Sequence, residues 1–264
     1  MQPLEHALIQ GRRPSAAAAA AATPARQSVL VAGAGGALGS RVLERLLGSG
    51  AFAPVQVLAT QPFHATTRGL QELLLEELHS GQAAPLALVV FDAPRRTNGR
   101  DDAFLAPQPQ GLAPLAARLH AAGVRDLLVV MPHAAASLPD ALQAGLANLS
   151  EQAVATLGFT RVAILRAARP APGTTSRGLQ RLADTLLEQL RLMLPQHRQP
   201  VRADHVARVA VAVARELSRA APGTRVLAPE RVWQAAQLDD PTAWVRSWLA
   251  GQELPDIHAR AGRM

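Results

Sequence analysis

The chain has 264 residues, 48% of them hydrophobic, with 20 prolines and 19 glycines, which is enough for one α/β domain with a large core. Its net charge of +7 comes from scattered arginines, and aromatic residues make up only 3% of the chain, so the sequence does not predict a nucleic-acid surface of basic and stacking side chains. The absence of cysteine excludes disulfides, zinc thiolate sites and thiol catalysis. No apolar run approaches membrane-spanning length, and we expect a soluble, cytoplasmic protein without a membrane partner.

Residues 1–27 are expected to form a leader outside the folded domain. They contain the alanine tract GRRPSAAAAAAATPARQ, in which Pro14 and Pro24 flank residues that offer little apolar surface for packing. The pair Arg12 and Arg13 ahead of this tract is faintly similar to an export signal. However, alanine makes a poor apolar region and no twin-arginine consensus follows. We therefore predict that the leader is disordered or loosely helical.

A glycine-rich loop is the most informative motif of the chain. It lies within residues 28–47 (SVLVAGAGGALGSRVLERLL), between a short apolar run and a segment with leucines at helical spacing. Its spacing can be read as G-x-G-x-x-x-G or as G-x-x-G-x-x-G. A strand, a glycine turn and a helix N-terminus together can hold a pyrophosphate on backbone N–H groups. The cofactor expected at this loop is a nicotinamide dinucleotide, NAD(P)(H). The residues predicted to contact it there are Gly33, Gly35, Gly36, Ala37, Leu38 and Gly39.

The rest of the chain alternates between predicted strands and helices. We expect strands at 55–60, 86–91, 124–131, 160–165 and 225–227, and helices at 112–122, 139–157, 176–194 and 203–217. Asp204 is expected to act near the start of the last of these helices. The segment 70–78 (LQELLLEEL) is ambiguous, because its leucines share a helical face while a doubly wound sheet needs another strand nearby. We favour a helix.

This alternation predicts a single α/β domain with a Rossmann-like, doubly wound and mostly parallel sheet that has helices on both faces. We place the domain at 28–236 and a C-terminal extension at 237–264. The ligand of such a fold binds outside the carboxyl ends of the strands. Four residues that follow predicted strands are therefore further candidates for cofactor binding: Thr60, Gln61, Asp92 and Ala93.

The segment after the second strand bears on the choice between the two nicotinamide dinucleotides. Residues 60–64 contain no acidic side chain, whereas an NAD site usually presents one to the ribose 2′-hydroxyl. A 2′-phosphate would meet no repulsive carboxylate from these residues, and Arg68 is the nearest cation in sequence. We expect a weak preference for NADPH.

Several stretches together resemble the atypical short-chain dehydrogenases, especially the NmrA-like and Tat-interacting-protein-like NAD(P)H-binding proteins. The resemblance covers roughly 28–236 and rests on the glycine loop and on three longer stretches. These are HAAGVRDLLVVMPHAAA at 120–136, LSEQAVATLGFTRVAILRAARP at 149–170 and PVRADHVARVAVAVA at 200–214. The glycine loop is the specific motif among them, and the others match at the level of fold.

This resemblance implies a Tyr-x-x-x-Lys pair that the chain lacks. With Glu151 placed on the family's helix glutamate, Gln143 and Ala147 stand where tyrosine and lysine belong. The sequence contains no tyrosine, and all 27 of its Lys+Arg residues are arginine, so no shift of register can restore the pair. Tyrosine-dependent hydride transfer is therefore not expected.

Other candidate functional groups have equally ordinary interpretations. His133 follows the strand at 124–131 on the expected ligand side and could donate a proton, although we favour the interpretation that it caps a loop. Arg95 and Arg96 could meet a phosphate or simply face solvent. The eight histidines show no spacing that suggests a metal site.

Three functions remain open at the level of sequence. The first is an NAD(P)(H)-binding sensor, regulator or assembly protein that passes its state to a protein partner. The second is an NAD(P)H-dependent oxidoreductase, for example a quinone reductase, without a catalytic tyrosine. The third is a scaffold that binds no nucleotide.

Overall fold

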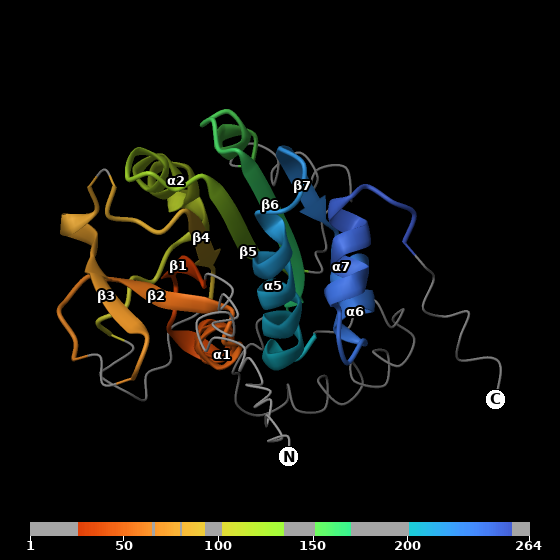
Figure 1. Ribbon diagram of the computed structural model, residues 1–264, viewed down its shortest axis with the longest axis horizontal. Coiled ribbons are helices and arrows are strands. Elements are labelled where there is room, and N and C mark those ends of the chain that lie inside the picture. The colour runs from red at the N-terminus through yellow and green to blue at the C-terminus, as the bar shows by residue number, and fades with distance from the viewer. Residues whose placement is uncertain are drawn as a thin grey trace, which may run out of the picture.

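The computed structural model describes residues 26–64, 67–79, 81–92, 102–134, 151–169 and 201–254. Seven strands of these residues form one sheet in the order β3-β2-β1-β4-β5-β6-β7, and every neighbouring pair runs parallel (Figure 1). The strands are β1 (Gln27–Ala32), β2 (Phe52–Ala59), β3 (Leu70–Leu74), β4 (Leu86–Val90), β5 (Asp126–Ala134), β6 (Arg161–Arg169) and β7 (Gly223–Leu227). This strand order is that of the Rossmann fold, with its reversal between β1 and β4, so the predicted fold class is confirmed.

Helices cover both faces of the sheet. They are α1 (Gly36–Gly48), α2 (Leu112–Ala121), α5 (Ala203–Leu217), α6 (Pro229–Ala236) and α7 (Thr242–Leu249), with short 3₁₀ turns at Leu75–Glu77 (η2) and Pro109–Gly111 (η3). The predicted helix at 203–217 is confirmed with the same bounds. Residues 151–155 are helical, whereas 139–150 and the predicted helix at 176–194 lie outside the described residues.

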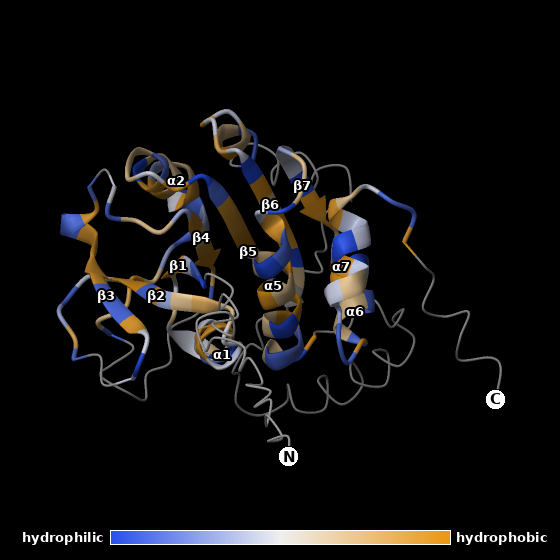
Figure 2. Ribbon diagram, viewed as in Figure 1, coloured by the Kyte–Doolittle hydropathy of each residue, from blue (hydrophilic) through white to orange (hydrophobic). Residues whose placement is uncertain are grey.

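The core consists of two apolar layers, one on each face of the sheet. One layer packs α1, α5, α6 and α7 against one set of strand side chains, and the other packs α2 and Val154 against the alternate set. All five residues of β4 are buried, as expected for a central parallel strand covered on both faces. Figure 2 shows the apolar residues gathered on these inner strands.

The segment 70–78 was predicted as a helix, and this prediction is wrong. Leu70–Leu74 forms strand β3 at the edge of the sheet, paired with β2 from Val55 to Ala59, and η2 follows it. Leu70 and Leu73 are the buried leucines of the strand. The spacing of the leucines is a local signal. The backbone pairing with β2 decides the conformation of this segment, and a local pattern does not reveal that pairing.

The last helix completes the layer that contains α5. Trp244, Val245 and Leu249 of α7 are buried in the same apolar cluster as α1 and α5. Figure 1 shows α6 and α7 beside α5. Among the described residues, no helix is both long and apolar enough to cross a membrane.

Candidate functional site

The glycine loop joins β1 to α1 as the sequence predicted. Strand β1 ends at Ala32 and helix α1 begins at Gly36. Gly33 has φ +88°, and a Cβ atom there would lie 2.0 Å from the carbonyl oxygen of Val90. A Cβ atom on Gly39 would lie 2.1 Å from the carbonyl oxygen of Gly33. Both glycines are therefore required by the packing of the protein itself, whether or not a ligand binds.

The two glycines between them differ in this respect. Gly36 adopts φ +78°, which residues with side chains rarely adopt. Gly35, the residue before the helix, has φ −78° and ψ 176°, an extended conformation open to any residue. The backbone conformation thus does not require a glycine at position 35.

The N-terminus of α1 receives its polar partner from a distant part of the chain. Gly35 offers no side-chain cap, and the first turn of α1 contains no acidic residue. The N–H group of Leu38 instead donates a 2.6 Å hydrogen bond to Oδ2 of Asp92, which follows strand β4. Strands β1 and β4 are neighbours in the sheet, so this contact lies at the point where the strand order reverses.

Thr60 and Gln61 lie at the end of β2 and are exposed. The N–H groups of both residues donate to the carbonyl oxygen of Ala103, at 2.8 Å and 3.4 Å. Phe104, next in the chain, forms an antiparallel bridge with Ala59. These contacts hold residues 60–61 close to the carboxyl end of β2.

An acidic residue near this loop was missed by the sequence analysis. Oε2 of Glu72, on β3, accepts a 2.6 Å hydrogen bond from the N–H group of Phe63. The ring of Phe63 also packs edge-on against Phe104, with centroids 5.0 Å apart. The strand pairing therefore brings a carboxylate to a loop that has none in its own sequence. The position of β3 was the signal that could have revealed it.

The remaining predicted positions are described only in part. His133 lies within β5, opposite Ala168 of β6, and its side chain lies outside what the structure describes. Ala93, Arg95 and Arg96 lie outside the described residues, as do Gln143 and Ala147. Across the described ranges, no group of three or more His, Asp or Glu side chains could hold a metal ion.

Glu151 forms a buried ion pair next to the strand that carries His133. Its carboxylate accepts from Nε of Arg166 at 3.1 Å and from Nη2 at 2.6 Å. The two side chains are 7% and 20% exposed, respectively. Arg166 lies on β6 opposite Met131. Both charges are engaged with one another, which favours a structural role for this pair over a catalytic one.

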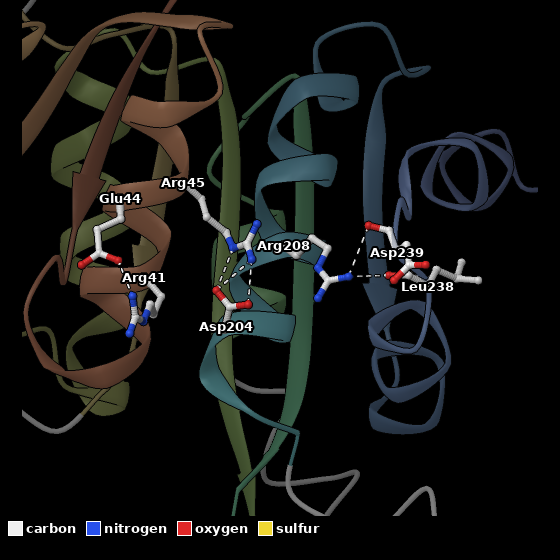
Figure 3. Close-up of polar contacts among 7 residues, drawn as sticks. All are labelled: Arg41, Glu44, Arg45, Asp204, Arg208, Leu238 and Asp239. Atoms are coloured by element: carbon white, nitrogen blue, oxygen red, sulfur yellow. Dashed lines mark hydrogen bonds and ion pairs between the residues drawn. The ribbon is translucent and has the colours of Figure 1, made fainter.

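A separate hollow of about 500 Å³ lies between α1, α5 and residues 239–242. Several of the charged side chains that line it are bonded to other lining residues or to the neighbouring backbone. Arg45 holds Asp204, and Nη1 of Arg208 donates to the carbonyl oxygens of Leu238 and Asp239 at 2.9 Å and 3.2 Å (Figure 3). The hydrogen bonds from Arg45 hold the pKa of Asp204 below its ordinary value. Asp204 thus ties two helices together and does not cap α5.

Comparison with known proteins yields similarity in structure alone. No protein-family model matches the chain, and no curated protein sequence matches it. Among solved structures, it is similar to a UDP-Glc/GlcNAc 4-epimerase from Campylobacter jejuni, with 13% identity, TM-score 0.46, and 81% of this chain and 85% of that chain covered.

Two other similar structures were determined with a dinucleotide. One is a triphenylmethane reductase from Citrobacter sp. complexed with NADP(H), at 17% identity and TM-score 0.42, covering 71% of this chain and 65% of that one. The other is a short-chain dehydrogenase/reductase superfamily protein from Agrobacterium tumefaciens with bound NAD. It has 17% identity and TM-score 0.42, and the match covers 76% and 77% of the two chains. The fold implied by the short-chain dehydrogenase resemblance is confirmed by the strand order.

Proposed function

We propose that this protein binds a nicotinamide dinucleotide at the glycine loop and acts as a sensor or regulator without tyrosine-dependent hydride transfer. The observation that carries the proposal is the place of the loop: it follows β1 at the reversal of the strand order and leads into the N-terminus of α1. The first turn of α1 offers N–H groups without partners from its own helix, together with the positive end of the helix dipole.

The absence of tyrosine and lysine supports a binding role over a catalytic one. A proton donor placed beside the nicotinamide contributes about a hundredfold or more to carbonyl reduction. The chain has no tyrosine, and all of its Lys+Arg residues are arginine, so it lacks the pair that supplies this step in the proteins it resembles. Binding without efficient turnover is the behaviour expected of a sensor.

The dinucleotide preference is proposed to be weak and toward NADPH. The lack of acidic side chains among residues 60–64 supports NADPH. The carboxylate of Glu72, held on the N–H group of Phe63, works against a large preference because it adds negative charge near the same loop. A Glu72→Gln variant should therefore shift the ratio of the two affinities further toward NADPH.

Calorimetric titration of the whole protein with NADPH and NADH tests the binding site. The sharpest variant is Gly35→Val, because position 35 accepts a side chain without backbone strain, whereas positions 33 and 36 do not. We expect Gly35→Val to lose binding and to keep the melting temperature of the parent within a few degrees. Gly48→Val, at an exposed position at the far end of the same helix, is the matched control and should bind as the parent does.

Two results would contradict the proposal. Failure of the parent protein to bind either dinucleotide would leave the scaffold interpretation. Unchanged binding by Gly35→Val would place the dinucleotide away from this loop.

A further inference from the structure

The first turn of α1 donates a hydrogen bond to a carboxylate of the protein itself, that of Asp92. The N–H group of Leu38 is one of the first few in the helix, which have no acceptor inside it. Oδ2 of Asp92 lies 2.6 Å from this nitrogen, and the two residues are 54 positions apart in the sequence. The contact therefore depends on the fold and is not a local turn.

The carboxylate of Asp92 accepts from the helix N-terminus at which a phosphate of the dinucleotide would also bind. A phosphate oxygen held by the first turn of α1 would accept from the same N–H groups, and the helix dipole favours either anion there. One N–H group cannot donate a full hydrogen bond to both. Two negative groups held side by side also repel one another, especially where water is partly excluded. Asp92 is half-buried, so solvent screens this repulsion incompletely.

We infer that Asp92 is a built-in competitor of the pyrophosphate at the glycine loop. Its carboxylate caps α1 through the N–H group of Leu38, and a bound dinucleotide must displace it from there. The inference rests on the proposed function, since it assumes that the loop binds a dinucleotide. Beyond the proposed function, it assigns to Asp92 a role in setting the affinity of the site. It also assigns to Asp92 two alternative arrangements.

The two arrangements supply what a sensor requires. A ligand changes the state of a protein only if it binds one conformation better than another. Here the two arrangements differ in one defined respect, with Asp92 either accepting from the N–H group of Leu38 or displaced from it. Asp92 lies just beyond Phe91, the residue after β4, so its displacement would take place next to the end of that strand.

The competition predicts opposite effects of one substitution on affinity and on stability. Asp92→Asn keeps an acceptor but removes the charge, and Asp92→Ala removes both. We expect NADPH to bind about tenfold more tightly to Asp92→Ala than to the parent, with Asp92→Asn between them. The melting temperature without ligand should follow the reverse order, because α1 loses its charged cap. Asp239→Asn, which removes an exposed carboxylate far from the loop, should change neither quantity.

The same titrations separate the failure of this inference from failure of the proposed function. If neither the parent nor the Asp92 variants bind NADPH, the proposed function is wrong and this inference is wrong with it. If the parent binds and the Asp92 variants bind equally or more weakly, the inference alone is overturned.

A measurement on the parent protein covers the case in which the Asp92 variants fail to fold. The carboxyl ¹³C resonance of Asp92 should shift as NADPH is added, with the same midpoint as the calorimetric titration. A resonance that stays unchanged through saturation would mean that Asp92 remains on Leu38, and would overturn the inference.

Discussion

Arg45 on α1 and Asp204 on α5 form a bidentate ion pair between helices that are distant in the sequence. Nη2 of Arg45 lies 2.7 Å from Oδ2 of Asp204, and Nε lies 3.0 Å from Oδ1. Figure 3 shows the planar ends of the two side chains facing each other. The pair links α1, which follows the glycine loop, to α5.

This ion pair is expected to contribute little to stability despite its good geometry. The two side chains are 35% and 45% exposed, so water and salt screen their attraction. A double-mutant cycle with Arg45→Ala and Asp204→Ala should give a coupling of about 0.5 kcal/mol in the free energy of unfolding. The coupling should decrease further in 1 M salt. A coupling several times larger would show that the pair is far less hydrated than its exposure indicates.

Two glycines of α1 should respond in opposite ways to alanine. Gly39→Ala places a Cβ atom 2.1 Å from the carbonyl oxygen of Gly33, so the helix must move away from the loop, at a cost of about 1–3 kcal/mol. Gly48→Ala meets nothing within 4 Å and should stabilise by about 0.5 kcal/mol through the better helix propensity of alanine. Thermal denaturation of the two variants measures both changes. Equal melting temperatures would refute the close packing of the loop on α1.

The sequence predicted the central part of the fold because its signals are local. The buried run of β4, the glycine loop and the periodic residues of α5 each identify an element without reference to other parts of the chain. The edge strand β3 could not be recognised in the same way. Its leucines also fit a helical spacing, and its pairing with β2 decides the outcome.

The sequence indicated where in the fold the candidate site lies, but it did not indicate which side chains contact one another there. Asp92 was expected at the site because it follows a predicted strand, yet its bond to Leu38 spans 54 residues of sequence. Glu72 was missed because only the strand pairing brings it to Phe63. Such contacts depend on the relative placement of elements, which hydrophobic periodicity does not encode.

The stability of the protein in acid should depend on Glu216, which links α5 to α7. Its carboxylate accepts from Arg246 at 3.2 Å and from Arg219 at 3.2 Å, and its side chain is 6% exposed. The hydrogen bonds from Arg246 are the main cause that holds the pKa of Glu216 below the ordinary value of 4.5. A group with a lowered pKa stabilises the folded state above its unfolded pKa. That contribution is lost as the pH falls through the folded value.

Glu216→Gln isolates this effect. At neutral pH the variant should be less stable than the parent by about 1 kcal/mol, because a hydrogen bond to a charged group is replaced by one to a neutral amide. The difference should shrink as the pH falls below about 4.5, the ordinary value for glutamate. Urea denaturation at a series of pH values gives the comparison. A difference that is constant with pH would show that Glu216 acts through packing and not through its charge.

The last prediction concerns chemistry and follows from side chains that the sequence lacks. Carbonyl reduction needs a proton donor beside the nicotinamide, and the chain has neither tyrosine nor lysine to supply the usual pair. We expect no appreciable oxidation of NADPH with simple aldehydes or ketones. We expect at most weak reduction of a quinone, an acceptor that needs little help from a proton donor and for which proximity to a bound hydride donor lowers the barrier.

Loss of NADPH absorbance with a panel of aldehydes, ketones and quinones measures this activity, and His133→Ala is the informative variant. His133 belongs to β5, whose carboxyl end lies on the side of the sheet where a ligand of this fold binds. Weak quinone reduction that is unchanged in His133→Ala would agree with a binding protein in which the histidine has no chemical role. Rapid turnover of a carbonyl substrate that His133→Ala abolishes would contradict the proposed sensor, because His133 would then be the proton donor of a reductase.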